Sequence, residues 1–284
     1  MFKIIKKEKL NDNVSRIIVD APHIARAAKP GNFVVVIPTE NAERIPLTIA
    51  DTDTHNGTIA IIFQIVGATT KMLDSLKEGD ELAHLLGPLG VPSHIEKYGT
   101  VVVIGGGVGI AEIYPVVKAL KAVGNKVVTI IGARCEELLI YREELRTHSS
   151  ELRTTTDDGT CGRKGFVSDE LKDIIASGEK INLVIAVGPV PMMKVCCDVT
   201  REHKIKTVVS LNPIMLDATG MCGVCRVVVG GKTKFACVEG PEFDGHEVDF
   251  KELTDRLKPY KDVEKQAMDH VCKLLKSSEL GVRS

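Results

Sequence analysis

The chain has 284 residues, and 44% of them are hydrophobic, which is enough for one large or two medium domains with buried cores. Its 37 Lys and Arg residues nearly balance 38 Asp and Glu residues, and the formal net charge of −1 argues against nucleic acid as a partner. No apolar run is long enough to cross a bilayer, and the first residues lack the apolar core of a signal peptide, so we expect a cytoplasmic protein without a membrane partner.

The first hundred residues are typical of β-structure. Turn signals rich in glycine, proline and asparagine separate short runs of β-branched residues. The clearest of these runs cover residues 15–20, 32–37 and 58–66. Several short strands at this spacing are typical of a barrel, so we expect a β-barrel domain over residues 1–97.

Two polar motifs interrupt the predicted barrel. In Arg44-Ile-Pro-Leu-Thr48, the planar guanidinium is suited to binding a phosphate, and the Thr48 hydroxyl to a hydrogen bond with a ring nitrogen. Gly67-Ala-Thr-Thr70 precedes a predicted helix over residues 71–76 and offers amides and hydroxyls to an anion. The alternative interpretations are a surface arginine and a simple helix N-cap.

The pattern changes near residue 98, where predicted strands begin to alternate with helices. The apolar run 100–104 leads directly into Gly105-Gly-Gly-Val-Gly109, and a helix with one apolar face follows. Further buried strands are expected at 127–131, 183–187 and 207–210. This alternation indicates a parallel sheet with crossover helices, so we expect an α/β domain over residues 98–210.

The glycine run is a candidate phosphate site. A turn without side chains lets a pyrophosphate approach the backbone amides at a helix N-terminus. The run departs from the usual dinucleotide fingerprint, because Ala111 or Glu112 stands where a third glycine is expected. The alternative is a tight turn that only allows close packing of the helix.

The stretch from Asp217 to Cys237 has the spacing D-x4-C-x2-C-x11-C. A plant-type [2Fe–2S] cluster uses C-x4-C-x2-C and a distant fourth cysteine, so Asp217, Cys222, Cys225 and Cys237 are the predicted ligands. In a cytoplasmic protein, eight cysteines also favour metal or redox chemistry over disulfides. A zinc site with Cys3Asp ligands and unliganded thiols are the alternatives.

The cluster stretch has its own local pattern. Gly220 and Gly223 permit a tightly curved backbone, and residues 227–229 begin a strand that Gly230-Gly231 turns back toward Phe235. We expect a cluster lobe over residues 211–250 and C-terminal helices over residues 251–284. One face of the last helix carries apolar side chains, namely Val263, Ala267, Val271 and Leu274.

The order of these motifs resembles the ferredoxin reductase-like flavoproteins over residues 1 to about 250. Within them, the chain is similar to the iron–sulfur electron-transfer subunits of class B dihydroorotate dehydrogenase. It is still more similar to the small (alpha) subunits of Nfn-type NADH-dependent ferredoxin:NADP oxidoreductases, a group that includes the corresponding flavoprotein of sulfide dehydrogenases. The resemblance implies a β-barrel FAD domain, a Rossmann-like NAD(P) domain and a C-terminal [2Fe–2S] lobe.

The resemblance also implies which residues bind each cofactor, and it assigns no catalytic residue. The flavin and its pyrophosphate would meet Arg44, Pro46, Leu47, Thr48, Gln64, Ile65, Val66, Gly67, Thr69 and Thr70. The nicotinamide nucleotide would meet Gly106, Gly107, Gly109, Arg134, Asp157, Asp158, Gly188 and Met192. The cluster would be bound by Cys222, Cys225 and Cys237, and Nfn-type small subunits resemble this chain in carrying aspartate at the position of Asp217.

The function implied by the family is electron transfer with a partner. NADH would reduce FAD, single electrons would pass through the cluster to a larger flavin and iron–sulfur subunit in a heterodimer, and the complex would couple NADH, NADPH and ferredoxin. Electron transfer to a dihydroorotate dehydrogenase is one alternative. A non-enzymatic nucleotide-binding module is the other.

The sequence departs from the wider family at three places. Arg44-Ile-Pro-Leu-Thr48 lacks the tyrosine that stacks on the flavin in many relatives, and Val187-Gly-Pro lacks the usual cysteine, for which Cys161 is a candidate substitute. Asp217 replaces the first cluster cysteine of the dihydroorotate dehydrogenase subunits. The choice between NAD and NADP stays open on the residues, because Arg134 suits a 2′-phosphate whereas Asp157 and Asp158 would repel one. The family favours NAD(H).

Overall fold

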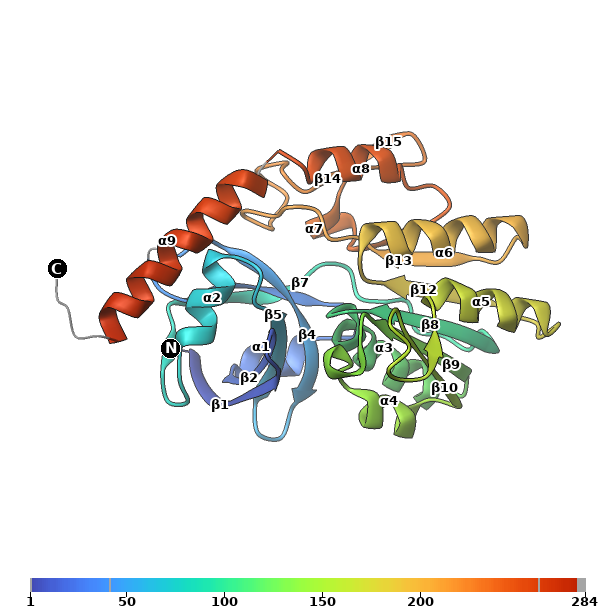
Figure 1. The fold of residues 1–284 in the computed structure, drawn as a ribbon, viewed down its shortest axis with the longest axis horizontal. Coiled ribbons are helices and arrows are strands. Elements are labelled where there is room, and N and C mark those ends of the chain that lie inside the picture. Colours follow the sequence, from blue (N-terminus) through green and yellow to red (C-terminus); the bar gives the residue numbers. More distant parts are fainter. Residues whose placement is uncertain (1, 41, 260, 280–284) are drawn as a thin grey trace.

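The computed structural model describes residues 2–40, 42–259 and 261–279. Figure 1 shows an antiparallel barrel on one side, a parallel sheet with helices on the other, and a lobe above the two. These three parts confirm the predicted fold class. Among the described residues, no helix combines the length and apolar character needed to cross a membrane.

The barrel is a nearly closed antiparallel sheet with the strand order β6-β1-β2-β5-β4-β3-β7. Its strands are β1 (Phe2–Asn11), β2 (Val14–Asp20), β3 (Phe33–Ile37), β4 (Ile45–Asp53), β5 (Thr58–Gln64), β6 (Glu81–Leu82) and β7 (His84–Leu89). Two helices accompany them, α1 (Pro22–Ala27) and α2 (Ala68–Ser75). Fully buried side chains such as Ile17, Ile61 and Phe63 fill the interior.

The three predicted barrel strands are confirmed as β2, β3 and β5, whereas β1 and β4 carry no clear strand signal. β1 is rich in lysine and buries little besides Ile4. β4 contains Pro46, which is unusual inside a sheet. The register explains why it is tolerated: Ile45–Thr48 pair with β3, and only the later part of β4, from Ile49 to Asp53, pairs with β5.

The second sheet has the strand order β11-β10-β9-β8-β12-β13-β16, and all its neighbours are parallel except β13 and β16. Its strands are β8 (Thr100–Gly106), β9 (Lys126–Ala133), β10 (Glu151–Thr156), β11 (Arg163–Lys164), β12 (Leu183–Val187), β13 (Thr207–Ser210) and β16 (Glu242–Asp244). The helices are α3 (Gly109–Ala122), η1 (Glu136–Leu138), α4 (Arg142–His148), α5 (Val167–Ala176) and α6 (Val190–Glu202). The four predicted strands are confirmed as β8, β9, β12 and β13.

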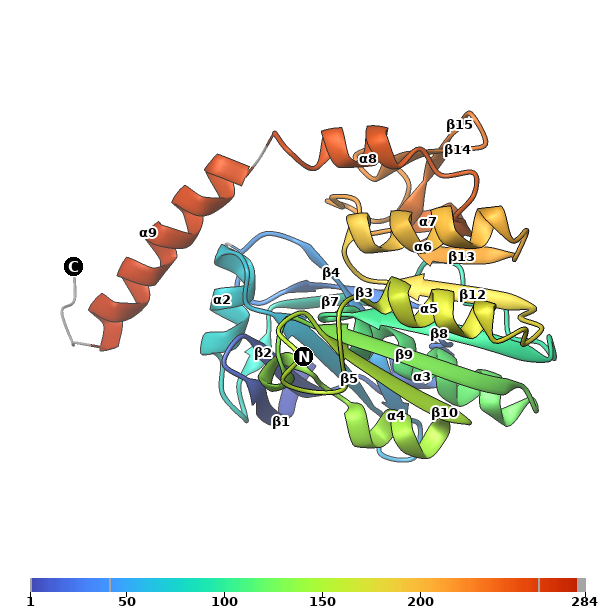
Figure 2. The same ribbon diagram turned by 45° about the vertical axis from the view of Figure 1, so that its right-hand side comes forward.

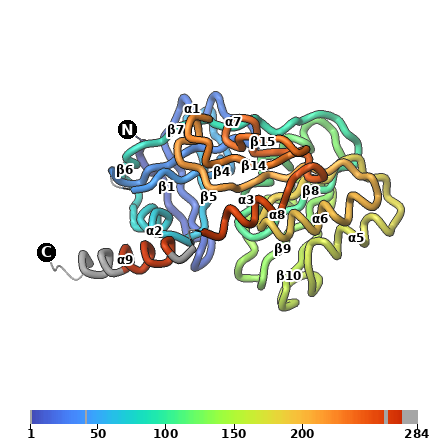
Figure 3. Tube along the Cα trace, turned by 90° about the horizontal axis from the view of Figure 1, so that it is seen from above, coloured from blue at the N-terminus to red at the C-terminus, as the bar shows by residue number. Residues whose placement is uncertain are grey.

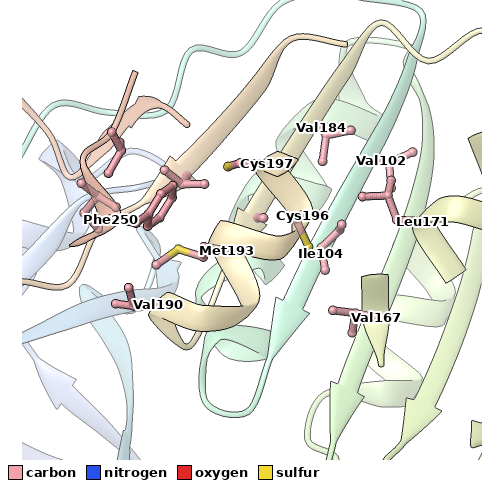
Figure 4. Close-up of a cluster of buried hydrophobic side chains, with 14 of the residues drawn as sticks. Val102, Ile104, Val167, Leu171, Val184, Val190, Met193, Cys196, Cys197 and Phe250 are labelled. Carbon is pink, nitrogen blue, oxygen red and sulfur yellow. The ribbon is translucent and has the colours of Figure 1, made fainter. Parts of the chain in front are cut away.

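Alternate side chains of β8 point to opposite faces of this sheet and belong to two cores. Val102 and Ile104 pack with α5 and α6, as Figure 4 shows. Val101 and Val103 belong to the core on the α3 and α4 face, which Figure 2 shows on the other side of the sheet. That second core also includes Ala50 of the barrel, so the barrel and the sheet share buried apolar surface.

The lobe contains the predicted hairpin, formed by β14 (Arg226–Val229) and β15 (Lys232–Phe235), with α7 (Ala236–Glu239) and α8 (Phe250–Arg256) beside it. The last helix, α9 (Lys261–Glu279), returns to the barrel and packs against α2, as Figure 3 shows from above. On its predicted apolar face, Val271 is buried, whereas Val263 is 62% exposed. The side chain of Leu274 lies outside the described residues.

Candidate functional site

The predicted nucleotide-binding residues gather at one edge of the parallel sheet. Gly106 ends β8 and Gly188 follows β12, and these neighbouring strands mark the point where the strand order reverses. Arg134 follows β9, and Asp157 and Asp158 follow β10 at the same edge. Ligands of open α/β sheets bind in the crevice at such a reversal, beyond the carboxyl ends of the strands.

The three glycines of the turn differ in what a side chain would meet. A Cβ on Gly106 would collide with Met192 Sδ, and one on Gly109 would lie 2.5 Å from the Val187 carbonyl oxygen. Gly107 has φ +58° and faces open space. Close packing of α3 against β12 therefore explains Gly106 and Gly109, while Gly107 leaves room for a ligand beside the backbone.

At the β9 and β10 end of this edge, Asp158 donates its backbone N–H to the Arg134 carbonyl at 3.1 Å. The Asp158 carboxylate accepts hydrogen bonds from the backbone and hydroxyl of Thr160, which lower its pKa. Cys161 lies in the same loop, where Arg142 Nη1 donates to its Sγ at 3.1 Å. Since β10 is three strand positions from β12, about 14 Å, Cys161 does not lie beside Gly188.

The predicted flavin residues follow β4 and the connection from β5 to α2. Arg44 Nη2 donates to the Asp217 carbonyl at 2.9 Å, and Arg44 Nε is buried without a hydrogen-bond partner among the described residues. Pro46, Leu47 and Thr48 lie in the part of β4 that pairs with β3 alone.

The connection from Gln64 to Thr70 is held largely by its own hydrogen bonds. Ile65 donates its backbone N–H to the Asn13 carbonyl at 2.8 Å. The Thr70 hydroxyl accepts from the N–H groups of Val66 and Gly67, so it acts as a local cap at the start of α2. Thr69 is buried, and Val66 is 69% exposed.

Glu112 is a candidate site residue that sequence reasoning did not select. It lies in the first turn of α3, and its carboxyl meets the Thr48 side chain of β4. The residue is half-buried, but its carboxyl lies deep between the two elements, and this burial raises its pKa. Its place directly after the glycine run was the available signal.

The cluster loop is organised around the Asp217 side chain. One carboxylate oxygen accepts from Thr219 N at 2.6 Å and Thr219 Oγ1 at 2.7 Å, and the other accepts from Cys222 N at 2.8 Å. These bonds, those from Thr219 first, lower the pKa of Asp217 to about 2. Ala218 and Gly220 have φ +60° and +84°, so the backbone curls tightly here, as the glycine pattern predicts.

The three predicted cysteine ligands lie in this lobe at different depths. Cys225 Sγ donates to Cys237 Sγ at 3.2 Å in a buried position, and Cys222 is exposed. Burial, followed by the contact with Cys225, raises the pKa of Cys237 to about 12. Among the residues that the structure describes, no three His, Cys, Asp or Glu side chains gather closely enough to hold a metal ion. Asp217 is instead bonded within its own turn, the alternative role of an aspartate in this position.

The residues nevertheless fit the cofactors by their chemistry. Three thiols and a carboxylate within one loop are donors that iron accepts, and two of the thiols already face each other. The buried Arg44 Nε offers an N–H to an anion at the flavin strand. Gly107 leaves open space at the nucleotide edge.

Known proteins match this arrangement. Residues 103–198 match the oxidoreductase NAD-binding domain, and residues 212–249 match the iron–sulfur cluster binding domain of dihydroorotate dehydrogenase B. A Thermotoga maritima homologue of the electron-transfer subunit of dihydroorotate dehydrogenase B (NAD(+)) is 46% identical over 98% of this chain and 98% of its own length. The chain belongs to the family of dihydroorotate dehydrogenase B electron-transfer subunits. An uncharacterized Clostridium beijerinckii family member is 48% identical, over 94% of this chain and 93% of its own length.

The family also includes a protein of known structure that is similar along nearly the whole chain. It is an NADH-dependent reduced ferredoxin-NADP oxidoreductase, studied for flavin-based electron bifurcation. It is 46% identical, with a TM-score of 0.90, and the match covers 95% of this chain and 97% of that one. This chain is therefore a family member with an NAD-binding domain and an iron–sulfur binding domain, and the predicted resemblance to Nfn-type proteins is confirmed.

Proposed function

We propose that this chain is the NADH-oxidising subunit of a bifurcating oxidoreductase of the Nfn type, with FAD and one [2Fe–2S] cluster. The observation that carries the proposal is the direct contact between the flavin strand and the cluster loop through Arg44 and Asp217. Buried apolar contacts extend that interface, because Ala218, Cys225 and Cys237 pack with Phe33 and Val35 of the barrel.

The chain's own residues would divide the work by location. The sheet edge, with Gly106, Gly107, Gly109, Arg134, Asp157, Asp158, Gly188 and Met192, binds the nicotinamide nucleotide. Arg44, Pro46, Leu47, Thr48 and the segment from Gln64 to Thr70 bind FAD, and Thr48 and Glu112 face each other beside the nucleotide turn. When bound, FAD exchanges a hydride with the nicotinamide and the cluster carries single electrons.

The fourth cluster ligand in this proposal is Asp217. Its spacing matches the plant-type pattern, and its carboxylate already accepts a hydrogen bond from the amide of the neighbouring ligand Cys222. A carboxylate is a harder donor than a thiolate, so it makes one iron's environment asymmetric. Asp217→Cys should retain a cluster with an altered spectrum and potential, and Asp217→Ala should lose cluster occupancy. A full, spectrally unchanged cluster in Asp217→Ala would assign the turn role instead.

The partner in this proposal is a larger flavin and iron–sulfur subunit that faces the cluster lobe. The structural relative described in terms of NADH, NADP and reduced ferredoxin supports this choice. A dihydroorotate dehydrogenase partner is the second candidate, favoured by the family description matched over residues 212–249. The complex isolated from its native source through a tag on this chain distinguishes them. We expect NADPH- and ferredoxin-linked activity; dihydroorotate-dependent reduction of NAD would establish the second candidate.

Cofactor content and nucleotide preference give a second test. The purified chain should be yellow-brown, with flavin and iron–sulfur absorption and about two irons per chain. A colourless protein that binds nucleotide would instead indicate a non-enzymatic module. Rapid mixing with NADH and NADPH should show faster bleaching of the flavin by NADH, and a clear NADPH preference would overturn the assignment of NAD(H).

A further inference from the structure

Arg44 joins two parts of the chain that are 173 residues apart in sequence. It precedes β4, the strand that carries the proposed flavin residues, and its Nη2 donates to the backbone carbonyl of Asp217 in the cluster loop at 2.9 Å. The contact is partly buried, where a hydrogen bond from a charged group is stronger than one in water.

Asp217 extends this contact to a cluster cysteine. While its backbone carbonyl accepts from Arg44, its carboxylate accepts from Cys222 N at 2.8 Å. The next residue, Ala218, is 1% exposed and packs in the cluster that contains Phe33 and Val35 of the barrel. A shift of the Arg44 guanidinium would therefore move a short, tightly bonded loop rather than a free one.

The guanidinium has donors left for a second partner. It carries five N–H groups in a planar fork, and its Nε is buried with no hydrogen-bond partner in the described part of the chain. A buried donor without a partner costs free energy, and an anion placed at the fork would remove that cost. In the proposed function, on which this inference rests, that anion is the pyrophosphate of FAD.

We propose that Arg44 couples FAD binding to the order of the cluster-binding loop. FAD fixes the guanidinium, the guanidinium fixes the Asp217 carbonyl, and Asp217 fixes the backbone at Cys222. Because such coupling is reciprocal, an assembled cluster also tightens FAD binding by the same factor. Arg44 acts here as a positioning residue for the cluster and needs no contact with the iron.

The first experiment compares the full-length chain with and without FAD. Iron release to a coloured chelator is timed after the flavin has been removed by high salt, and again after FAD is restored. We expect FAD to slow iron release by about tenfold, the equivalent of one charge-assisted hydrogen bond. FAD affinity, measured by fluorescence quenching, should fall by about the same factor when the cluster is removed. Equal rates and equal affinities would overturn the proposal.

Two variants assign the coupling to Arg44. Arg44→Lys keeps the charge, but a single ammonium lacks the planar fork and does not bridge both partners. At saturating FAD it should release iron as fast as the FAD-free chain. The matched control is Thr48→Val, which should weaken FAD binding and yet, once saturated, protect the cluster as the native chain does. Full protection in Arg44→Lys would overturn the role of Arg44.

Hydrogen exchange decides the case if the Arg44 variants do not accumulate. In the native chain, FAD should slow exchange of the Thr219 and Cys222 amides, both of which donate to Asp217. Unchanged exchange at these amides would refute the coupling. The proposed function fails separately, because a chain that binds neither FAD nor iron would contradict the cofactor assignment, whereas independent binding of both contradicts only the coupling.

Discussion

The parallel sheet and the cluster lobe position their binding residues in different ways. In the sheet, the nucleotide edge is defined by the ends of β8 and β12, whose interiors are almost completely buried. In the lobe, the ligand loop depends on hydrogen bonds to one aspartate, on residues with positive φ and on a small apolar cluster. A site at strand ends is therefore preformed, whereas a site on such a loop needs its ligand and its neighbours to keep its shape.

Removing a cluster ligand should produce the largest effect and separate the two regions. Cys225→Ser should abolish the cluster and all electron transfer through it, because Cys225 is one of the two facing buried thiols. Absorption and electron paramagnetic resonance would show the loss, and proteolysis should then cut the lobe first. Reduction of FAD by NADH should persist. Cys272→Ser, on α9, is the control that keeps its cluster; loss of NADH oxidation in Cys225→Ser would contradict the separation.

A cavity in the sheet tests the opposite side of the comparison. Ile104 is fully buried between the sheet and α5 and α6 (Figure 4). Ile104→Ala should lower the free energy of unfolding by about 2–5 kcal/mol. Leu216→Ala, at a side chain of the lobe that is 51% exposed, should change it by less than about 0.5 kcal/mol. Denaturant unfolding followed by circular dichroism measures both, and equal losses would mean that the lobe shares the core's stability.

Glycine substitutions examine how strictly the sheet edge is shaped. Gly109→Ala should weaken NADH binding by about tenfold or more, because its Cβ would meet the Val187 carbonyl and displace the start of α3. Gly107→Ala meets no neighbour but adopts a left-handed conformation, which costs about 1–2 kcal/mol in stability. Titration of both variants with NADH, together with thermal unfolding, tests this. A weaker effect at Gly109 than at Gly107 would contradict it.

The smallest expected effect concerns the junction between the two regions. Burial raises the pKa of Glu242 in β16, whose carboxylate accepts from Ser93 Oγ at 2.5 Å. The folded chain therefore retains this proton to a higher pH than the unfolded chain, and stability falls as pH rises from the unfolded pKa through the folded one. Glu242→Gln should remove that loss, gaining stability relative to the native chain at about pH 8 but not at about pH 5. A constant difference across this range would contradict the shift.

The regular parts of the fold could be predicted because their residues report their surroundings. Buried parallel strands read as continuous apolar runs, so β8, β9, β12 and β13 were identifiable. β10, with the sequence Glu-Leu-Arg-Thr-Thr-Thr, and the lysine-rich β1 were not, because neighbouring strands rather than their own side chains make them β-structure.

The candidate site divides in the same way. The cysteine spacing and the glycine run are local, and they marked the lobe and the nucleotide turn. The contact between Arg44 and Asp217, and that between Glu112 and Thr48, join distant segments, so no short pattern contains them. The hydrogen bonds of the Asp217 carboxylate depend on the positive φ of Ala218, a conformation that an alanine gives no reason to expect.

The short strand β16 has a consequence for solubility. It pairs antiparallel with β13 and so closes what would be an open edge of the parallel sheet, and it lies within the segment that matches the iron–sulfur domain. An unpaired strand edge is a template for joining another chain. Loss of iron that disorders the lobe would uncover the β13 edge, which makes this chain prone to aggregate when it is produced faster than clusters are supplied.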